Sequence, residues 1–303
     1  MNRRVATGLI VLAVCVLAVV AGFAGRGFST ASDMTAVTTL IPETGTAATV
    51  SPAEAPSVSP APPSRFEPLA YPSAAPIPAR ELKVPILMYH HVGEPPADAD
   101  KIRRGLTVSA ADFDAQMGYL KSAGYQPISQ TELFNALFAG KPLPANPVVI
   151  TFDDGYTDNY EVALPILQKY AFPATFYIIS DRVGEAEYMT WDQVTWLDRE
   201  GMDIGSHTAT HPDLTEIPSA EALNEFTGSA QILQTYLGHP VYWLCYPAGK
   251  YDDTVVSLAR SSGYLLAVTT KAGEVQSSST PLTLWRYRVR NDTGLAGFEE
   301  LVR

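Results

Sequence analysis

Residues 147–156 read Pro-Val-Val-Ile-Thr-Phe-Asp-Asp-Gly-Tyr, and this stretch decides the fold class. Its first six residues are mainly apolar, which predicts a buried strand over 147–152. The carboxylates of Asp153 and Asp154 follow at once, and burying both is costly unless positive charge lies near them. Because neighbouring strand residues point to opposite sides, one Asp can bind a metal while the other faces a nearby water. Gly155 permits the sharp turn that follows; an ordinary Asp-Asp-Gly surface turn is the alternative.

Short apolar runs alternate with amphipathic segments on both sides of this stretch. Strands are expected at 84–89, 174–179, 202–204, 241–245 and 264–269, and helices at 109–123, 159–170, 221–237 and 253–262. Repeated β-then-α units predict an α/β fold with a parallel sheet, either closed as a barrel or open. In such folds the functional side chains gather where the strands end.

A pair of histidines follows the strand expected at 202–204, in the segment Ser-His-Thr-Ala-Thr-His at 206–211. His207 and His211 are spaced so that both imidazoles can reach one ion. With one Asp of the first stretch they form a ligand set suited to Zn²⁺, with a position left open for water. The second Asp is then the base that activates this water. A histidine pair that only caps a loop is the alternative.

A third segment, Tyr-Pro-Ala-Gly-Lys-Tyr-Asp at 246–252, follows another expected strand. Proline and glycine in this order shape a rigid turn whose backbone N–H groups can face a ligand. An ordinary strand-to-helix turn would contain the same residue types.

In order and spacing, these three segments resemble the motifs of the carbohydrate esterase family 4 polysaccharide deacetylases. The resemblance runs from about Leu82 to about Val289, and includes Met-Thr-Trp-Asp at 189–192 and Pro-Ile-Leu-Met-Tyr-His-His-Val at 85–92. It implies a distorted (β/α)₇ barrel of parallel strands over residues 81–303. It also implies hydrolysis of acetyl groups on a sugar polymer.

The resemblance further implies roles for individual residues. The metal ligands would be Asp154, His207 and His211, with Zn²⁺ as the expected ion and Co²⁺, Ni²⁺ or Mn²⁺ as alternatives. Asp153 would be the general base, and the N–H of Ala248 would help to hold the oxyanion. Residues expected to line a substrate groove are Tyr246, Pro247, Trp191, Trp285 and His91; for the two tryptophans, a place in the core is the alternative.

The chain departs from the family pattern at two positions. Many members carry an Arg two residues before the proline of the third motif, where it orients the base, but here this position is Cys245. We expect Arg286 to replace it, with Arg288 as second choice, because a nearby cation keeps an Asp ionised.

The second departure concerns the general acid. The family pattern often supplies it from a His late in the sequence, but in this chain no His follows His239. The Tyr-His-His segment at 89–91 resembles the branch that acts on poly-β-1,6-N-acetylglucosamine, in which the His directly after the Tyr is the acid. That alignment makes His90 the acid, with a pKa suited to proton donation near neutral pH.

The first 80 residues of the chain predict its location. Arg3 and Arg4 precede 21 residues without charge, 5–25, which is long enough to span a bilayer core. We expect residues 1–26 to form a single-pass anchor with the catalytic domain outside; a signal peptide cleaved near Ala24 is the alternative. Residues 27–80 are rich in Pro, Ala, Ser and Thr, which predicts a disordered linker.

Composition limits the function further. The net charge of −11 argues against a nucleic-acid partner. Together with the family resemblance, this leads us to expect a monomeric, metal-dependent enzyme that removes acetyl groups from an N-acetylated polysaccharide. The alternatives are a tethered glycan-binding protein without activity, a deacetylase of O-acetyl esters, and a glycosidase, which would need two carboxylates flanking the scissile bond.

Overall fold

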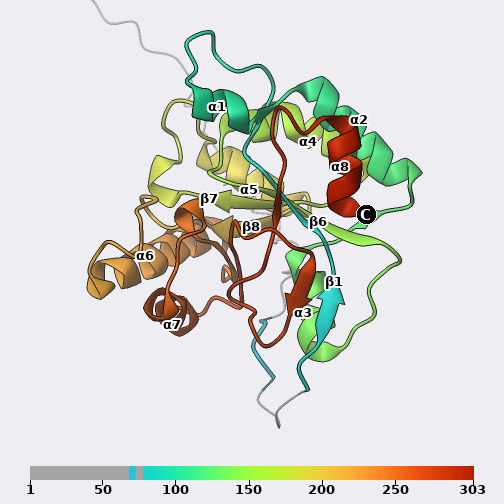
Figure 1. Cartoon of the computed structure of the whole chain (residues 1–303). Coiled ribbons are helices and arrows are strands. Elements are labelled where there is room, and N and C mark those ends of the chain that lie inside the picture. The colour runs from blue at the N-terminus through green and yellow to red at the C-terminus, as the bar shows by residue number, and fades with distance from the viewer. Residues whose placement is uncertain (1–67, 73–77) are drawn as a thin grey trace, which may run out of the picture. The chain divides into compact units, whose positions relative to one another are not determined.

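The computed structural model of the chain describes residues 68–72 and 78–303 (Figure 1). Within this part, eight strands form a curled sheet in the order β10-β9-β8-β7-β6-β2-β12, with β5 pairing beside β6. Every pairing in this sheet is parallel. Its strands are β2 (Ile86–Tyr89), β5 (Gln126–Pro127), β6 (Pro147–Phe152), β7 (Thr175–Ile178), β8 (Asp203–Ser206), β9 (Trp243–Cys245), β10 (Leu266–Val268) and β12 (Tyr287–Arg288).

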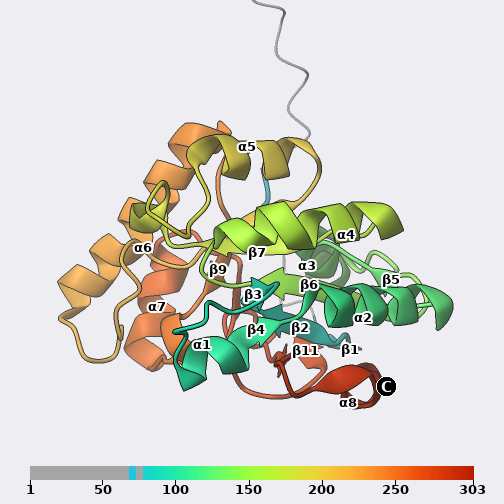
Figure 2. The ribbon, with the colours of Figure 1, turned by 90° about the horizontal axis from the view of Figure 1, so that it is seen from above.

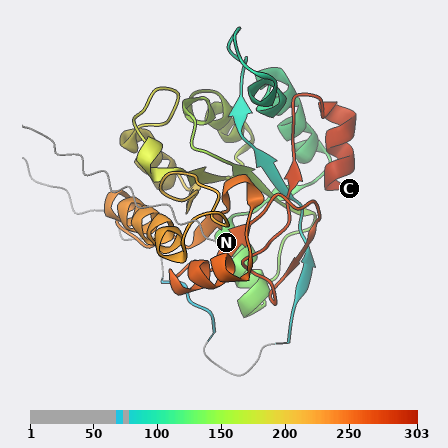
Figure 3. The same ribbon diagram turned by 60° about the vertical axis from the view of Figure 1, so that its left-hand side comes forward.

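Helices surround this sheet, with α2, α4 and α5 along one side and α6 and α7 grouped away from α8 (Figures 2 and 3). They are α1 (Lys101–Leu106), α2 (Ala110–Ser122), α3 (Gln130–Ala139), α4 (Leu164–Tyr170), α5 (Trp191–Arg199), α6 (Ser219–Leu237), α7 (Asp253–Ser261) and α8 (Gly294–Val302). Single turns are the π-helical η1 (Asn159–Ala163) and the 3₁₀ turns η2 (Ser180–Arg182) and η3 (Pro247–Gly249). Two further small sheets pair β1 (Glu81–Lys83) with β11 (Val275–Ser277), and β3 (His91–Val92) with β4 (Thr107–Val108).

The segment 281–289 joins the two edges of the curled sheet. Leu284 forms a parallel bridge with Val268 of β10, and Tyr287 pairs with Leu87 of β2. The expectation of a parallel barrel therefore holds in its general form, a curled sheet of parallel strands with surrounding helices. The strands expected from the sequence are present, although several are shorter than expected.

Successive side chains along β6 point alternately to the outer and the inner face of the curled sheet. Val148 and Ile150 belong to the apolar layer beneath the helices, which contains Met117 of α2 and Leu167 of α4. The residues between them point the other way, and fully buried Thr151 lies on that inner side. Asp153 continues this alternation, so the strand itself directs its carboxylate into the barrel.

The N-terminal boundary of the domain differs from the expected position. Residues 68–72 fall inside the linker expected at 27–80, yet Leu69 and Tyr71 pack on the domain core. Their polar groups are fixed too, because the Leu69 N–H donates to Tyr242 Oη at 3.2 Å and Tyr71 Oη donates to the Leu265 carbonyl at 2.6 Å. The apolar run at 5–25 lies outside the described residues. Among the residues that are described, no helix is both long and apolar enough to cross a membrane.

Candidate active site

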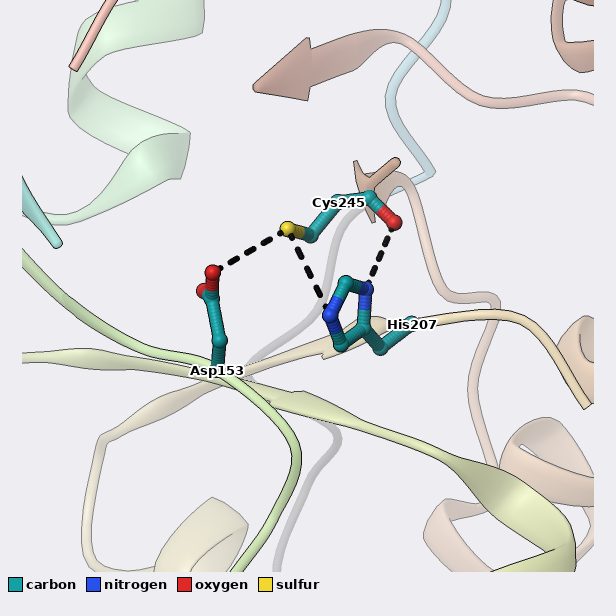
Figure 4. Close-up of side chains that lie close together, drawn as sticks. All are labelled: Asp153, His207 and Cys245. Carbon is teal, nitrogen blue, oxygen red and sulfur yellow. Dashed lines mark hydrogen bonds between the residues drawn. The ribbon is translucent and has the colours of Figure 1, made fainter. Parts of the chain in front are cut away.

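The carboxyl ends of neighbouring strands bring the motif residues together. Asp153 and Asp154 follow β6, and His207 follows β8. Cys245 ends β9, next to β8 in the sheet, and Figure 4 shows its side chain between those of Asp153 and His207. His90 follows β2 on the other side of β6. The parallel order of these strands thus places distant parts of the sequence around one point.

Asp154, His207 and His211 form a candidate metal site. Asp154 Oδ1 lies 3.3 Å from His207 Nε2 and 3.7 Å from His211 Nε2, and the possible ligand atoms all lie within 4.8 Å of one another. The backbone at two of these residues has an uncommon conformation. Asp154 has φ 77° and His211 has φ 65°, in the left-handed region that residues other than glycine rarely adopt.

Hydrogen bonding prepares the two ligand types for a cation. His207 Nδ1 lies 2.8 Å from the Cys245 carbonyl oxygen, which only accepts, so Nδ1 carries a proton and Nε2 is the nitrogen that faces Asp154 and can bind a cation in the neutral ring. The pKa of Asp154 lies well below its usual range, because bonding to His207 outweighs the opposing effect of burial. This donor set of one carboxylate and two imidazoles fits Zn²⁺ or a similar ion.

Arg286 contacts the adjacent carboxylate, Asp153. Its Nη1 and Nη2 donate to Asp153 Oδ1 and Oδ2, both at 2.7 Å, and neither side chain is more than 4% exposed. The guanidinium also donates to Thr151 Oγ1, to the Thr269 carbonyl and to Cys245 Sγ, at 3.0, 2.9 and 3.1 Å. Arg288, the second choice, is exposed and makes no such contact.

The pairing decides the protonation state of Asp153. Burial acts to raise the pKa of its carboxyl, but the charge and hydrogen bonds of Arg286 outweigh burial and lower it to about 2. Asp153 is therefore a carboxylate at neutral pH, as a proton acceptor must be.

His90 faces the same carboxylate. Its Nε2 lies 3.9 Å from Asp153 Oδ2, and its Nδ1 is enclosed without a hydrogen-bond partner among the described residues. Burial lowers the pKa of His90, partly opposed by the charges of Asp153 and Asp154. The backbone of His90 is fixed, because Asn159 Nδ2 donates to its carbonyl at 2.6 Å.

His91 points to a different place from His90. Its Nδ1 lies 2.7 Å from Asp158 Oδ2, and its ring stacks on Tyr156 with centroids 3.6 Å apart. Sequence reasoning assigned no role to three residues that closely follow the Asp pair, Tyr156, Asp158 and Asn159. Only the three-dimensional pairing of β2 with β6 shows that they support the two histidines.

The turn that carries Ala248 sits beside this centre. Ala248 is exposed and has φ 52°, within the 3₁₀ turn of Pro247–Gly249. The carbonyl of Cys245, three residues earlier, accepts the hydrogen bond of the candidate ligand His207. The turn and the metal site are therefore joined through one strand end.

The structure shows the surroundings of four residues that were expected in a substrate groove. Tyr246 is fully buried in a core cluster, where its Oη has no hydrogen-bond partner within the described chain. Trp191 stacks on Tyr236 of α6 with centroids 3.8 Å apart, and Lys271 Nζ lies 4.2 Å from the centre of the Trp285 ring. Pro247 is buried as well.

The geometry to this point defines a class: hydrolases with a candidate divalent-ion site at the mouth of a parallel barrel. Residues 140–267 match the family model described as "Polysaccharide deacetylase". YxkH of Bacillus subtilis is 32% identical over 215 residues, which cover 71% of this chain and 74% of YxkH. The chain belongs to the polysaccharide deacetylase family, carbohydrate esterase family 4.

Two further relatives are informative. The Streptococcus pyogenes deacetylase PplD, solved in complex with acetate, is 32% identical with a TM-score of 0.68; the match covers 74% of this chain and all of PplD. The poly-β-1,6-N-acetyl-D-glucosamine N-deacetylase of Escherichia coli K12 is 33% identical over 138 residues. That match covers 40% of this chain and only 20% of the E. coli protein.

Proposed function

We propose that this polysaccharide deacetylase removes acetyl groups from a polymer of N-acetylglucosamine by metal-dependent hydrolysis. The observation that carries the proposal is the buried pair of Asp153 and Arg286 beside the ligand set of Asp154, His207 and His211. A glycan-binding protein without activity needs no ionised carboxylate at that place. A glycosidase would instead need two carboxylates flanking a glycosidic bond.

The residues divide the reaction between them. A divalent ion, when bound by Asp154, His207 and His211, supplies Lewis acidity for the acetyl carbonyl and the attacking water. Asp153, ionised and oriented by Arg286, accepts the proton of that water. The Ala248 N–H contributes to holding the oxyanion.

Proton transfer to the leaving nitrogen completes the balance. The C–N bond breaks as His90 gives its proton to the amine, so one water and one acetamide yield acetate and a free amine. His90 fits this role because its imidazole lies on the same side of the site as Asp153.

The proposal for the substrate rests on sequence. A His directly after the Tyr, as at 89–90, resembles the poly-β-1,6-N-acetylglucosamine branch, and a relative of that name matches part of the chain. An O-acetyl ester is the second candidate, because the same centre attacks either carbonyl.

Acetate release is the direct test. The purified protein is incubated with peptidoglycan, chitin oligomers and poly-β-1,6-N-acetylglucosamine, before and after treatment with a chelator and re-addition of Zn²⁺, Co²⁺, Ni²⁺ or Mn²⁺. We expect release from at least one polymer, loss on chelation and recovery with metal. Glycan retention without release from any polymer would favour the binding protein.

We also propose that residues 1–26 hold the protein at the membrane with the catalytic domain outside, on the basis of the apolar run at 5–25. Fractionation of cells tests this: recovery of a protein shortened near Ala24 in the medium would favour cleavage and secretion.

A further inference from the structure

A cavity of about 590 Å³ adjoins the candidate active site. His91 and Tyr156 line it together with residues of the segment Pro96 to Leu106, which includes α1. His91 follows the proposed acid His90 directly, and Tyr156 follows the ligand Asp154 by two residues. Burial and the nearby Asp154 carboxylate raise the pKa of the Tyr156 hydroxyl, so this open cavity borders the candidate site through Tyr156. Its volume lies in the range of ligand sites.

The imidazole of His91 offers this cavity a hydrogen-bond acceptor. His91 is 1% exposed, and its Nδ1 lies 2.7 Å from Asp158 Oδ2. In the neutral imidazole, the hydrogen bond to this carboxylate places the ring proton on Nδ1 and leaves a lone pair on Nε2. Nε2 makes no hydrogen bond within the described residues, and His91 is one of the residues that line the cavity. The proposed reaction does not use this nitrogen.

Neighbouring side chains fix the acceptor in place. The Tyr156 ring stacks on His91 with centroids 3.6 Å apart, which sets the plane of the imidazole. Arg103 also lines the cavity, where Asp158 at 3.9 Å and Glu187 at 3.6 Å offset its charge, and its buried Nε has no hydrogen-bond partner among the described residues. Three carboxylates line the cavity as well, those of Asp98, Asp100 and Glu187, so the net charge of the lining is negative and favours a ligand that donates hydrogen bonds.

We propose that this cavity is a subsite for the sugar next to the one being deacetylated, and that His91 Nε2 accepts a hydrogen bond from it. The donor is a sugar hydroxyl or the ammonium group of a residue already deacetylated, since both present the same chemistry to an acceptor. This inference rests on the proposed deacetylase function, because it defines the neighbour of the reacting sugar.

Chain-length dependence tests the subsite. The measured quantity is the ratio of kcat/KM for acetate release from a tetramer of N-acetylglucosamine to that from the monomer. In Asp158→Asn, the amide can donate to His91 Nδ1, which moves the ring proton to Nε2 and replaces the acceptor with a donor. We expect the ratio to fall about tenfold, the loss of one good hydrogen bond.

Ala99→Trp provides a second variant, because it fills the cavity without touching the buried network around Asp158. We expect a similar fall of the ratio. The matched control is Gln234→Trp. Gln234 lies on α6 and lines a surface hollow of about 480 Å³, so this variant should leave the ratio unchanged. An unchanged ratio in both Ala99→Trp and folded Asp158→Asn would overturn the subsite while leaving the deacetylase proposal intact.

A second arm identifies the donor. Tetramers that carry a free amine beside the target sugar are compared with fully acetylated ones. A preference for the amine that Asp158→Asn abolishes indicates the ammonium group; equal rates that both fall in this variant indicate a hydroxyl. No acetate from any substrate would overturn the proposed function itself, and the subsite with it.

Discussion

At the scale of single residues, the central feature is a buried charge pair assembled from distant positions. The family pattern places an arginine where this chain has Cys245, and the small thiol leaves room for the Arg286 guanidinium, which lies 3.1 Å from Cys245 Sγ. The cation thus reaches Asp153 from the segment that closes the barrel. Because both partners are desolvated, removing one leaves an uncompensated buried charge, which typically costs about 3–5 kcal/mol.

Replacing Arg286 should therefore change the titration of Asp153. In Arg286→Gln the effect of burial is opposed only by the smaller contributions of His90 and His207, so the Asp153 pKa rises from about 2. With a raised pKa, Asp153 becomes protonated at a higher pH than in the wild type. The acidic limb of the kcat/KM profile therefore moves to higher pH. We also expect kcat near neutral pH to fall by about a hundredfold or more. The pH–rate profile of acetate release measures both effects.

Arg288→Gln is the matched control, since Arg288 is exposed and makes no hydrogen bond to Asp153. Its profile should keep the shape of the wild type. If Arg286→Ala retains activity within about twofold of the wild type, Arg286 does not orient the base.

The adjacent histidines should separate in kinetics. His90→Gln removes the proposed acid beside Asp153, and we expect kcat to fall by about 10²–10⁴. His91→Gln leaves that side of the site in place, so its main effect should be on KM for long substrates. Steady-state kinetics of both variants on one oligomer decide this. A normal kcat in His90→Gln with loss in His91→Gln would exchange the two roles.

At the scale of elements, the sequence predicted where strands end better than it predicted which side chains are buried. The strand expected at 147–152 is β6 with the same bounds, and the motif residues lie at the strand ends. Burial was harder to predict, because a motif specifies residue types but not the layer that covers them. Tyr246 lies in the core because it packs in one cluster with Phe226 of α6 and Val255 of α7, the helices directly before and after β9.

The turn after β9 offers a test at this scale. Gly249 has φ 71°, and a Cβ there would lie 2.2 Å from Thr270 Oγ1 and 2.7 Å from the Thr270 backbone nitrogen. Gly238 has a similar φ of 79° but open space around it. We expect Gly238→Ala to cost about 1–2 kcal/mol of unfolding free energy, the left-handed penalty alone. Gly249→Ala should cost about 1–3 kcal/mol more through overpacking.

Denaturant unfolding of the two variants measures that difference. Gly249→Ala should also lower kcat, because the turn carries Ala248, whereas Gly238→Ala should not. Equal stability losses would mean that Thr270 moves aside without cost.

At the scale of the whole molecule, the candidate site and the attachment of residues 68–72 lie at opposite ends of the barrel. The candidate site occupies the carboxyl ends of β6, β8 and β9. Residues 68–72 are attached at the other end, since Tyr242 and Leu265, their hydrogen-bond partners, come just before β9 and β10. Composition alone placed these residues in a linker, because two apolar side chains in a proline-rich stretch form no periodic pattern. Their docking depends on partners almost 200 residues away.

This separation predicts that the lead-in segment stabilises the domain without taking part in the chemistry. Tyr71 packs its ring 5.0 Å from that of Phe138 and 6.0 Å from that of Phe134, and its hydroxyl donates to the Leu265 carbonyl. Tyr71→Ala removes the ring and the hydrogen bond together, so we expect a loss of about 2–4 kcal/mol of unfolding free energy. Tyr71→Phe removes only the hydroxyl and should cost about 1 kcal/mol.

Both variants are measured twice, by denaturant unfolding and by kcat under conditions where each is fully folded. Because the affected contacts lie at the end of the barrel opposite to Asp153, kcat should match the wild type while the unfolding midpoint shifts in the order Tyr71→Ala, Tyr71→Phe, wild type. A fall in kcat with unchanged stability would show that the two ends of the barrel are coupled, and that residues 68–72 act on the site through the strands between them.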